Sequence, residues 1–335
     1  MPLAPRGWPL LVCAAASLAG CAEETIAPQP ILTATFVTFN TGTTDGLPHD
    51  DPPDDGFGSE QAAISDEWYG DGLSWLAAVD AATSFFAEVK PDVVAFQEIF
   101  YSGECEAIPE ELRTGFVCET FAPGDPTVAQ VILGQGYQVA CHLGKSDKCI
   151  AVRRAFGTLR GCDADLCLDG LDGAEIEGCG SGSRVGRGVI DLSRGGELTV
   201  VNVHGSSGFT DADLDCRQAQ FEQLFIDLGD GEPAANGERN LIMGDFNTDP
   251  ARAAFLDWSA RRLNELVSES PGFHFVTAVG EDAPPTYANA VNIDHVISDR
   301  LEGSCVHPGA TPGTQPVASF VYFDHVPAVC VLELF

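Results

Sequence analysis

An apolar run that ends abruptly in two oxygen-bearing side chains constrains the fold of this chain more than any other segment. The run covers residues 241–243 and is followed directly by Gly244-Asp245-Phe246-Asn247. Such a run is typical of a buried strand, in which alternate residues face the same way, so Asp245 and Asn247 are expected to point together. A carboxylate and an amide converging there suit a divalent cation or attack on phosphorus. An Asx-rich turn is the alternative interpretation.

Other apolar runs also end in polar side chains or are interrupted by them. These side chains are Asn40, Gln97 and Glu98, Asn202 and His204, Asp294 and His295, and Asp324 and His325, with Arg187 as a weaker member. Taken singly, Glu98 could begin a helix, His204 could be a core histidine bonded to a carbonyl, and Asp294 could form a surface ion pair. Acids and histidines beside buried strands are costly unless they are paired or bind a metal, so the whole series indicates a functional site.

The spacing of the apolar runs predicts many short strands and few helices. Strands are expected at 35–39, 93–96, 137–140, 150–152, 188–192, 198–204, 240–243, 292–298 and 328–334. Helices are expected at 72–90, at 211–229 and from about 250 to 267, where Pro250 suits a first turn. This pattern indicates an α/β fold in which two packed, mostly antiparallel sheets are flanked by helices.

Segments 45–72 and 157–186 are expected to be surface excursions. The first has neither helical nor strand periodicity and carries the aspartates Asp50, Asp51, Asp54, Asp55 and Asp66. A calcium-binding loop is the alternative, but the Asp-x-Asp-x-Asp-Gly spacing is missing, which favours a solvated acidic loop. The second segment is rich in glycine, aspartate and cysteine and predicts an insertion stapled by disulfides.

The N-terminal residues read as a targeting segment. Residues 1–20 contain Arg6 followed by a short apolar run, which is too short to span a bilayer as a stable helix. Leu18-Ala19-Gly20-Cys21 resembles the bacterial lipobox, so Cys21 is the expected lipidation site and anchors the chain to a membrane. An ordinary cleaved secretory signal is the alternative. Residues 21–30 would be a tether and 31–335 the folded domain. Both interpretations predict export, either as a cell-envelope lipoprotein at the outer membrane or cell surface, or as a secreted protein.

The cysteine count agrees with export. Of twelve cysteines, Cys13 lies in the targeting segment and Cys21 is the expected lipidation site. An even number remains, which predicts disulfides in an exported chain, and no Cys-x-x-Cys pair favours zinc instead. Local pairs are expected for Cys105 with Cys118, Cys141 with Cys149, and Cys305 with Cys330. Pairing among Cys162, Cys167, Cys179 and Cys216 stays open.

The formal net charge of −33 limits the partners of the chain. So acidic a surface repels polyanions, which disfavours phosphate-led, non-specific binding of nucleic acid at low salt. A highly soluble extracellular surface is the simplest explanation of the charge. A nuclease is still allowed, because bound divalent cations and a local basic cleft can offset the repulsion.

In their order along the chain, the polar motifs resemble those of the endonuclease/exonuclease/phosphatase superfamily, the deoxyribonuclease I-like hydrolases. That pattern runs Phe-Asn, Gln-Glu, Asn-x-His, Gly-Asp-(Phe/Leu)-Asn, Ile-Asp-(Tyr/His) and Asp-His-x-Pro. The matching residues are Asn40, Glu98, His204, Asp245 with Asn247, Asp294, and Asp324 with His325. The resemblance covers residues 31–335 and implies a four-layer α/β sandwich. Phe323 replaces the usual serine, and the segment after His204 differs from that of abasic-site endonucleases.

The resemblance also implies roles for these residues in magnesium-assisted hydrolysis of a phosphate ester, with Mn²⁺ or Ca²⁺ as alternative ions. Glu98 and Asn40 would bind the metal, and Asp245 and Asn247 would orient water and phosphate. Asp324 would hold the tautomer of His325. His204, steadied by Asp294, would bind or protonate the phosphoryl group. Arg187, or less readily Arg184, would contact the substrate phosphate.

The resulting functional hypothesis is an exported or membrane-anchored Mg²⁺-dependent phosphodiesterase or nuclease that acts as a monomer. A sphingomyelinase-like or phosphoinositide-type phospholipid hydrolase is the first alternative. A non-catalytic anchored binding protein is the second, although the intact acids and histidines argue against it. In such folds specificity lies in the loops between the motifs, so the sequence does not discriminate among phosphate-ester substrates.

Overall fold

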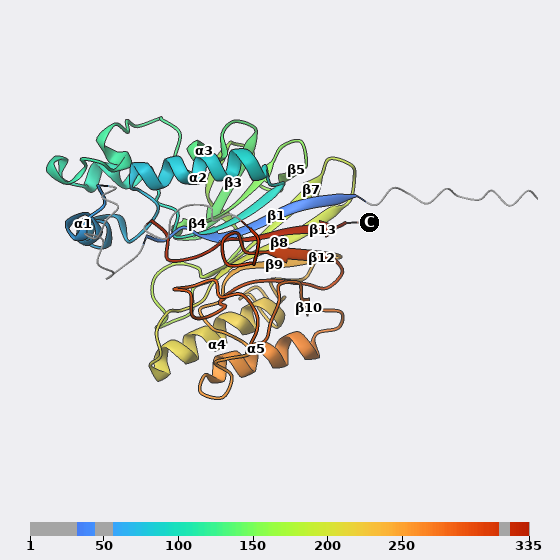
Figure 1. The fold of residues 1–335 in the computed structure, drawn as a ribbon. Coiled ribbons are helices and arrows are strands. Elements are labelled where there is room, and N and C mark those ends of the chain that lie inside the picture. Colours follow the sequence, from blue (N-terminus) through green and yellow to red (C-terminus); the bar gives the residue numbers. More distant parts are fainter. Residues whose placement is uncertain (1–31, 44–55, 315–321, 335) are drawn as a thin grey trace, which may run out of the picture.

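Two mixed β-sheets form the centre of the molecule in the computed structural model, which describes residues 32–43, 56–314 and 322–334 (Figure 1). The expected targeting segment, Cys21 and the tether lie outside these residues. One sheet has the order β12 (Glu302–Val306), β13 (Ala328–Glu333), β1 (Thr33–Asn40), β2 (Val93–Gln97), β4 (Lys145–Arg153), β3 (Tyr137–His142) and β6 (Leu166–Leu171). The other has the order β10 (His274–Phe275), β11 (Asp294–Ser298), β9 (Asn240–Asp245), β8 (Glu197–His204), β7 (Val185–Leu192) and β5 (Gly157–Leu159).

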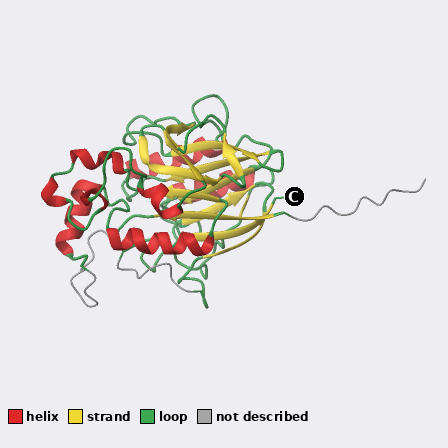
Figure 2. Cartoon of the chain, turned by 90° about the horizontal axis from the view of Figure 1, so that it is seen from above, coloured by secondary structure: helices red, strands yellow, loops and turns green. Residues whose placement is uncertain are grey.

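Helices cover the outer face of each sheet, which completes four layers (Figures 1 and 2). α1 (Ser59–Tyr69), α2 (Leu76–Val89) and α3 (Val128–Leu133) lie on the side of the seven-stranded sheet. Short 3₁₀ turns at Ser102–Ala107, Glu110–Leu112 and Val117–Glu119 continue that layer. α4 (Asp211–Phe225) and α5 (Trp258–Glu269) cover the six-stranded sheet. Within the described part of the chain, no helix is long and apolar enough to cross a membrane.

Three apolar layers hold the sheets and helices together. Phe36 of β1 packs between the two sheets. Val37 and Phe39, on the opposite face of the same strand, pack under the helices of the seven-stranded sheet. Phe221 of α4 and Leu263 of α5 pack on the outer face of the six-stranded sheet. Because alternate residues of a strand face opposite sides, strands buried on both faces need nearly continuous apolar runs. This requirement explains why such runs marked the strands in the sequence.

The predicted fold class is confirmed. Most strand pairs are antiparallel, and the described parallel pairs are β1 with β2, β3 with β6, and β8 with β9. The third predicted helix starts later than expected, at Trp258, because the Asp257 side chain accepts hydrogen bonds from the backbone of Ser259 and Ala260 and caps the helix there.

Both predicted surface excursions contain regular structure, so these predictions were wrong in part. The first part of segment 45–72, up to residue 55, lies outside the described residues. Most of the rest forms α1, which buries Ser65 and Tyr69. The apolar and polar residues of this helix are poorly separated on its two faces, so its sequence shows no clear helical periodicity. Segment 157–186 supplies β5 and β6, which extend one edge of each sheet. The faces of these two edge strands are partly exposed, so they carry fewer apolar residues than the central strands.

Five disulfides join ten cysteines of the described chain. The predicted local pairs Cys105–Cys118, Cys141–Cys149 and Cys305–Cys330 are confirmed. The pairing that the sequence left open is Cys162–Cys167 and Cys179–Cys216. The last bridge ties α4 to the segment before β7, across a sequence separation of 37 residues.

We expect no free thiol in the folded domain, because each described cysteine is paired. Thiol titration of the denatured, unreduced protein measures this directly, and several reactive thiols would refute the pairing. Removing Cys179–Cys216 by the double change to serine is expected to lower the free energy of unfolding by roughly 2–5 kcal/mol. The same change at Cys162–Cys167, which closes a loop of 5 residues, is the matched control and should cost less.

Candidate active site

The strand topology brings the predicted polar side chains to one end of both sheets. β1 and β2 are parallel, so Asn40 and Gln97 lie side by side at their carboxyl ends. β8 and β9 are parallel in the other sheet and place His204 beside Asp245. β11 runs antiparallel to β9, so Asp294, its first residue, also lies beside Asp245. Residues separated by most of the chain therefore meet where the two sheets open.

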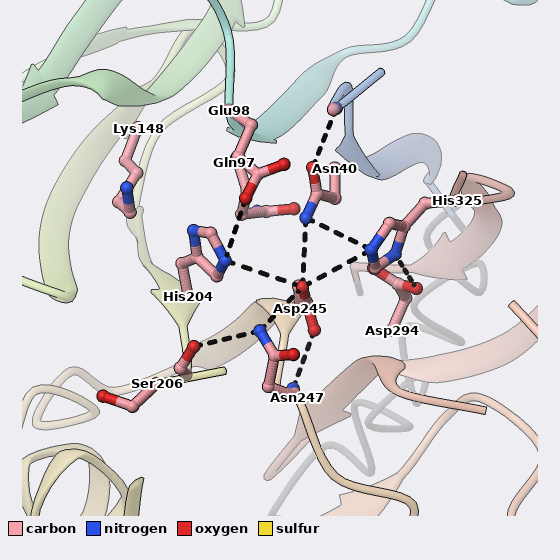
Figure 3. A network of polar contacts seen from close by, with 12 residues as sticks. Asn40, Gln97, Glu98, Lys148, His204, Ser206, Asp245, Asn247, Asp294 and His325 are labelled. Atoms are coloured by element: carbon pink, nitrogen blue, oxygen red, sulfur yellow. Dashed lines mark hydrogen bonds and ion pairs between the residues drawn. The ribbon is translucent and has the colours of Figure 1, made fainter. Parts of the chain in front are cut away.

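Asp245 is the centre of this group (Figure 3). Its Oδ2 accepts a hydrogen bond of 3.0 Å from the Asn40 side-chain amide, which links the two sheets. Beneath this contact, the Gln97 amide donates to Asn202 Oδ1 at 2.6 Å, a second link between the sheets. Both links are buried, and buried polar pairs of this kind fix the relative position of the elements that carry them. Asn202 and Gln97 thus act as positioning residues under the site.

Asn247 lies against Asp245 as predicted, but through a turn rather than through strand alternation. Its backbone N–H donates to Asp245 Oδ1 at 2.7 Å and its side-chain amide to Oδ2 at 3.1 Å. The φ of Asn247 is +51°, in the left-handed region that asparagine tolerates better than most residues. The segment therefore forms the Asx turn that was the alternative interpretation, and this turn still brings Asp245 and Asn247 together. The Asn247 amide also donates to the carbonyl of Gly205 at 3.0 Å.

His325 is held by Asp294, which corrects the predicted pairing with Asp324. His325 Nδ1 lies 2.8 Å from Asp294 Oδ2, whereas Asp324 Oδ1 is 4.0 Å from Nε2. Asp324 comes directly before His325 in the chain, yet its carboxylate lies on the Nε2 side of the ring and farther away than that of Asp294. Nε2 of His325 faces Asn40 at 3.3 Å and Asp245 at 3.7 Å. The carboxylate of Asp294 sets the orientation of this histidine.

His204 pairs with Glu98 and Asp245 rather than with Asp294, a second correction. Its Nε2 lies 3.5 Å from Glu98 Oε1 and 3.7 Å from Asp245 Oδ2. Asp294 pairs instead with His325, through Oδ2. Glu98 has a φ of +56°, a conformation that non-glycine residues rarely adopt and that turns its carboxylate into the site. A side chain at Gly42 would collide with Glu98 Oε2, so the glycine leaves space for this carboxylate.

The carboxyl groups of the site are poised for a cation. Burial raises the pKa of Asp245 to about 7, and the charge of Asp294 adds to the effect while His325 opposes it. Burial and the charges of Glu98 and Asp245 raise the pKa of Asp324 to about 8, although His325 again lowers it. Burial also raises the pKa of Glu98. Carboxyls gathered in this way favour a bound positive ion, which would return them to the charged form.

The two histidines differ in their protonation. Burial lowers the pKa of His204 well below its usual value, and the positive charges of Lys148 and Arg184 lower it further. Burial alone would lower the pKa of His325 too, but the charges of Asp294 and Asp245 outweigh it and raise that pKa well above its usual value. His204 is therefore neutral and His325 positively charged near neutral pH.

The donor set on the Glu98 side fits a hard divalent cation. Asp324 Oδ1 is buried and has no hydrogen-bond partner among the described residues, and Glu98 supplies a carboxylate nearby. Carboxylate and amide oxygens are the ligands that Mg²⁺ and Ca²⁺ prefer. Asp245, Asp294 and His325 also present ligand atoms within 4.8 Å of one another. A cation there would have to break the hydrogen bond between His325 and Asp294, so the Glu98 side is the better site.

Arg187 does not reach the group, contrary to its predicted role at the substrate phosphate. Its guanidinium is bound by Asp230 at 2.7 Å, by Asp172 at 3.1 Å, and by the Pro233 carbonyl. The positive charges that act on Glu98 come instead from His325, Lys148 and Arg184. Lys148 is buried beside Asp147 and was not predicted as a site residue. A lysine directly before the apolar run 149–152 was the available signal.

Comparison with known proteins gives the same assignment. A model of the Endonuclease/Exonuclease/phosphatase family matches residues 37–318, whereas no curated protein sequence matches the chain. An endonuclease/exonuclease/phosphatase from Beutenbergia cavernae DSM 12333 aligns with a TM-score of 0.51 and 14% identity, over 90% of this chain and 72% of that one. ANGEL2, a 2′,3′-cyclic phosphatase, aligns at 0.52 and 12% identity, over 91% and 96%. These low identities show the fold alone, but the match to the family model spans most of the sequence. The chain belongs to the endonuclease/exonuclease/phosphatase family, whose members are metal-dependent enzymes that act on phosphate esters.

Proposed function

We propose that this protein is an exported, Mg²⁺-dependent phosphodiesterase that hydrolyses its substrate by metal-assisted attack of water on phosphorus. The observation that carries the proposal is the largely buried convergence of two acids, two amides and two histidines around Asp245. Two features on the metal side add support: Asp324 Oδ1 has no hydrogen-bond partner among the described residues, and Gly42 leaves space for Glu98. Mn²⁺ or Ca²⁺ would fit the same oxygen ligands with different geometry.

Glu98 and Asp324, with Asn40, would hold the metal. When bound, the ion would stabilise the negative charge that develops on the phosphoryl oxygens. Asp245 would accept a proton from the attacking water, since its pKa of about 7 is suited to a general base near neutral pH. Asn247, fixed by its bonds to Asp245 and Gly205, would orient that water.

The two histidines would take different parts in the same reaction. Neutral His204 would donate a hydrogen bond from Nε2 to a phosphoryl oxygen. This nitrogen lies 3.5 Å from Glu98 Oε1 and 3.7 Å from Asp245 Oδ2. Charged His325, oriented by Asp294, would stabilise the transition state or protonate the leaving oxygen. Arg184 or Lys148 would supply positive charge in place of Arg187, whose guanidinium is already paired.

The proposal includes export and action as a monomer, with anchoring through a lipidated Cys21. The disulfides of the described domain are compatible with export. Nucleic acid and lipid headgroups both offer phosphodiesters, but the net charge of −33 weakens the case for a nuclease that binds by non-specific attraction. A phospholipid hydrolase is the second candidate, favoured by the exposed apolar side chains beside the site.

A panel of three substrates tests the proposal. Supercoiled plasmid, phosphatidylcholine or sphingomyelin vesicles, and bis(p-nitrophenyl) phosphate would each be incubated with Mg²⁺ and, separately, with a chelator. We expect turnover of at least one phosphodiester with Mg²⁺ and none with chelator. Failure of the folded protein to hydrolyse any of them with Mg²⁺, Mn²⁺ or Ca²⁺ would instead support the non-catalytic alternative.

A further inference from the structure

The most exposed apolar side chains of the described chain gather on two loops. Phe209, Phe255 and Leu256 have 85%, 78% and 73% of their surface accessible, and Ile226 follows at 50%. Single exposed apolar residues are common and need no explanation. Three of this size, each exposing almost its whole side chain, indicate a surface that has a use.

Local helix structure does not account for these residues. Phe209 precedes Thr210, the N-cap of α4, a position where an apolar residue often packs on the fourth residue of the helix. Here that residue, Leu214, is buried while Phe209 is exposed, so the packing is not made. Leu256 holds the same position before the Asp257 cap of α5. Its partner in that motif would be Arg261, a charged residue whose guanidinium donates to the carbonyl of Ala254 at 2.8 Å.

A fully buried arginine joins the two loops. Arg217 Nη1 donates to the carbonyls of Ser206 at 2.6 Å and Gly208 at 3.1 Å, and Gly208 is bonded directly to Phe209. Arg217 Nη2 pairs with Asp257 at 3.0 Å, next to Leu256. One guanidinium thus spans the two loops and places their exposed side chains in one region. We call Phe209, Phe255 and Leu256 the apolar rim.

The apolar rim borders the candidate active site. The first loop starts at Gly205, whose carbonyl accepts from the Asn247 amide at 3.0 Å. In the second, Thr248 follows Asn247 directly and its hydroxyl donates to Asp257 at 2.6 Å. Both loops follow strands that carry catalytic candidates, β8 with His204 and β9 with Asp245. A surface that meets the rim would therefore face the site as well.

We propose that the apolar rim inserts into the surface of a zwitterionic phospholipid bilayer and presents lipid headgroup phosphodiesters to the site. This rests on the proposed function and names its substrate class. The three side chains of the rim expose roughly 500 Å² of surface, the size of the largest apolar patch on many monomers, and patches of that size are often functional. A stable complex with another protein buries about 800 Å² of surface on each partner. A patch of the size of the apolar rim suits shallow insertion into lipid better.

Charge selects the kind of membrane. The chain carries a net charge of −33, and α4, which starts two residues after Phe209, has Asp211 and Asp213 in its first turn. Anionic lipids would be repelled, whereas zwitterionic headgroups carry no net charge. The same charge repels a polyanionic nucleic acid. Nucleic acids contact exposed apolar side chains mainly through base stacking. Binding is therefore expected to weaken as anionic lipid is added.

Local fluorescence tests the docking without relying on activity. The full chain with Phe255→Trp would be mixed with phosphatidylcholine vesicles that contain brominated acyl chains, with the parent protein and its four tryptophans as background. We expect blue-shifted, quenched emission from the new tryptophan, and less of both when phosphatidylglycerol is added. Ile226→Trp, at the far end of α4, is the matched control and should stay unquenched. Equal quenching at both positions, or at neither, would overturn the docking.

Turnover tests the substrate class. The triple change Phe209→Ser, Phe255→Ser and Leu256→Ser is expected to lower the ratio of activity on phosphatidylcholine vesicles to activity on bis(p-nitrophenyl) phosphate at least tenfold, since burial of one such side chain is worth about tenfold or more in affinity. Ile226→Ser should keep the wild-type ratio. An unchanged ratio in the triple variant overturns the inference while leaving the phosphodiesterase in place. If the wild-type protein hydrolyses neither substrate, the proposed function is refuted. The fluorescence measurement would still decide whether the rim docks on a bilayer.

Discussion

Changing His325→Ala is expected to lower kcat for phosphodiester hydrolysis by about 10²–10⁴-fold, the usual contribution of a positioned proton-transfer group. His325 is buried, and its pKa is raised because Asp294 and Asp245 outweigh the effect of burial. Steady-state kinetics on bis(p-nitrophenyl) phosphate measure the loss, with circular dichroism to verify the fold. His274→Ala is the matched control, because His274 lies on β10, which pairs with the end of β11 remote from Asp294.

The partner of His325 provides an independent check on this result. If Asp294 acts only by orienting His325, Asp294→Asn should lower kcat and add little to the loss in His325→Ala, because the two residues work as one unit. Asp324→Asn should behave differently and raise the Mg²⁺ concentration needed for activity. Additive losses for Asp294 and His325, or a normal Mg²⁺ requirement in Asp324→Asn, would contradict the pairing assigned here.

Changing Glu98→Gln is expected to lower activity by about 10²-fold or more, since metal stabilisation of charge in the transition state is worth several kcal/mol. Glutamine keeps the shape of the side chain but removes the carboxylate that would bind the ion. Activity should be measured across a range of Mg²⁺ concentrations, where weaker binding appears as a shifted midpoint. Glu88→Gln, on the exposed side of α2, is the control and should leave both values unchanged.

The sequence predicted which residues meet, but not how they pair. Apolar runs that end in polar residues identified Asn40, Glu98, His204 and Asp245, because buried strands need continuous apolar sequence and the topology aligns their ends. The pairing of Asp294 with His325 depends on side-chain direction across two sheets, which no local pattern encodes. The predicted pairing of Asp324 with His325 was implied by the family resemblance and did not include this side-chain geometry. Arg187 failed as a predicted phosphate ligand because its partners Asp172 and Asp230 lie far away in sequence.

The limits of fold prediction have a similar origin. The central strands were found because both of their faces are buried. β5 and β6 lie at sheet edges, where fewer apolar residues are needed, and their glycine-rich sequences resemble loops. α1 is weakly amphipathic for the same reason, since most of its surface faces solvent. Tertiary context forms these elements, so local periodicity alone could not reveal them.

Turnover of bis(p-nitrophenyl) phosphate by the full-length protein, measured with and without metal, tests most directly whether these residues form one phosphodiesterase site. We expect p-nitrophenol release with Mg²⁺, loss of release with chelator, and recovery when Mg²⁺ is restored in excess. Folded Glu98→Gln and His325→Ala should release little at any Mg²⁺ concentration that supports the wild type. Full turnover in excess chelator, or ordinary turnover by folded Glu98→Gln, would contradict it.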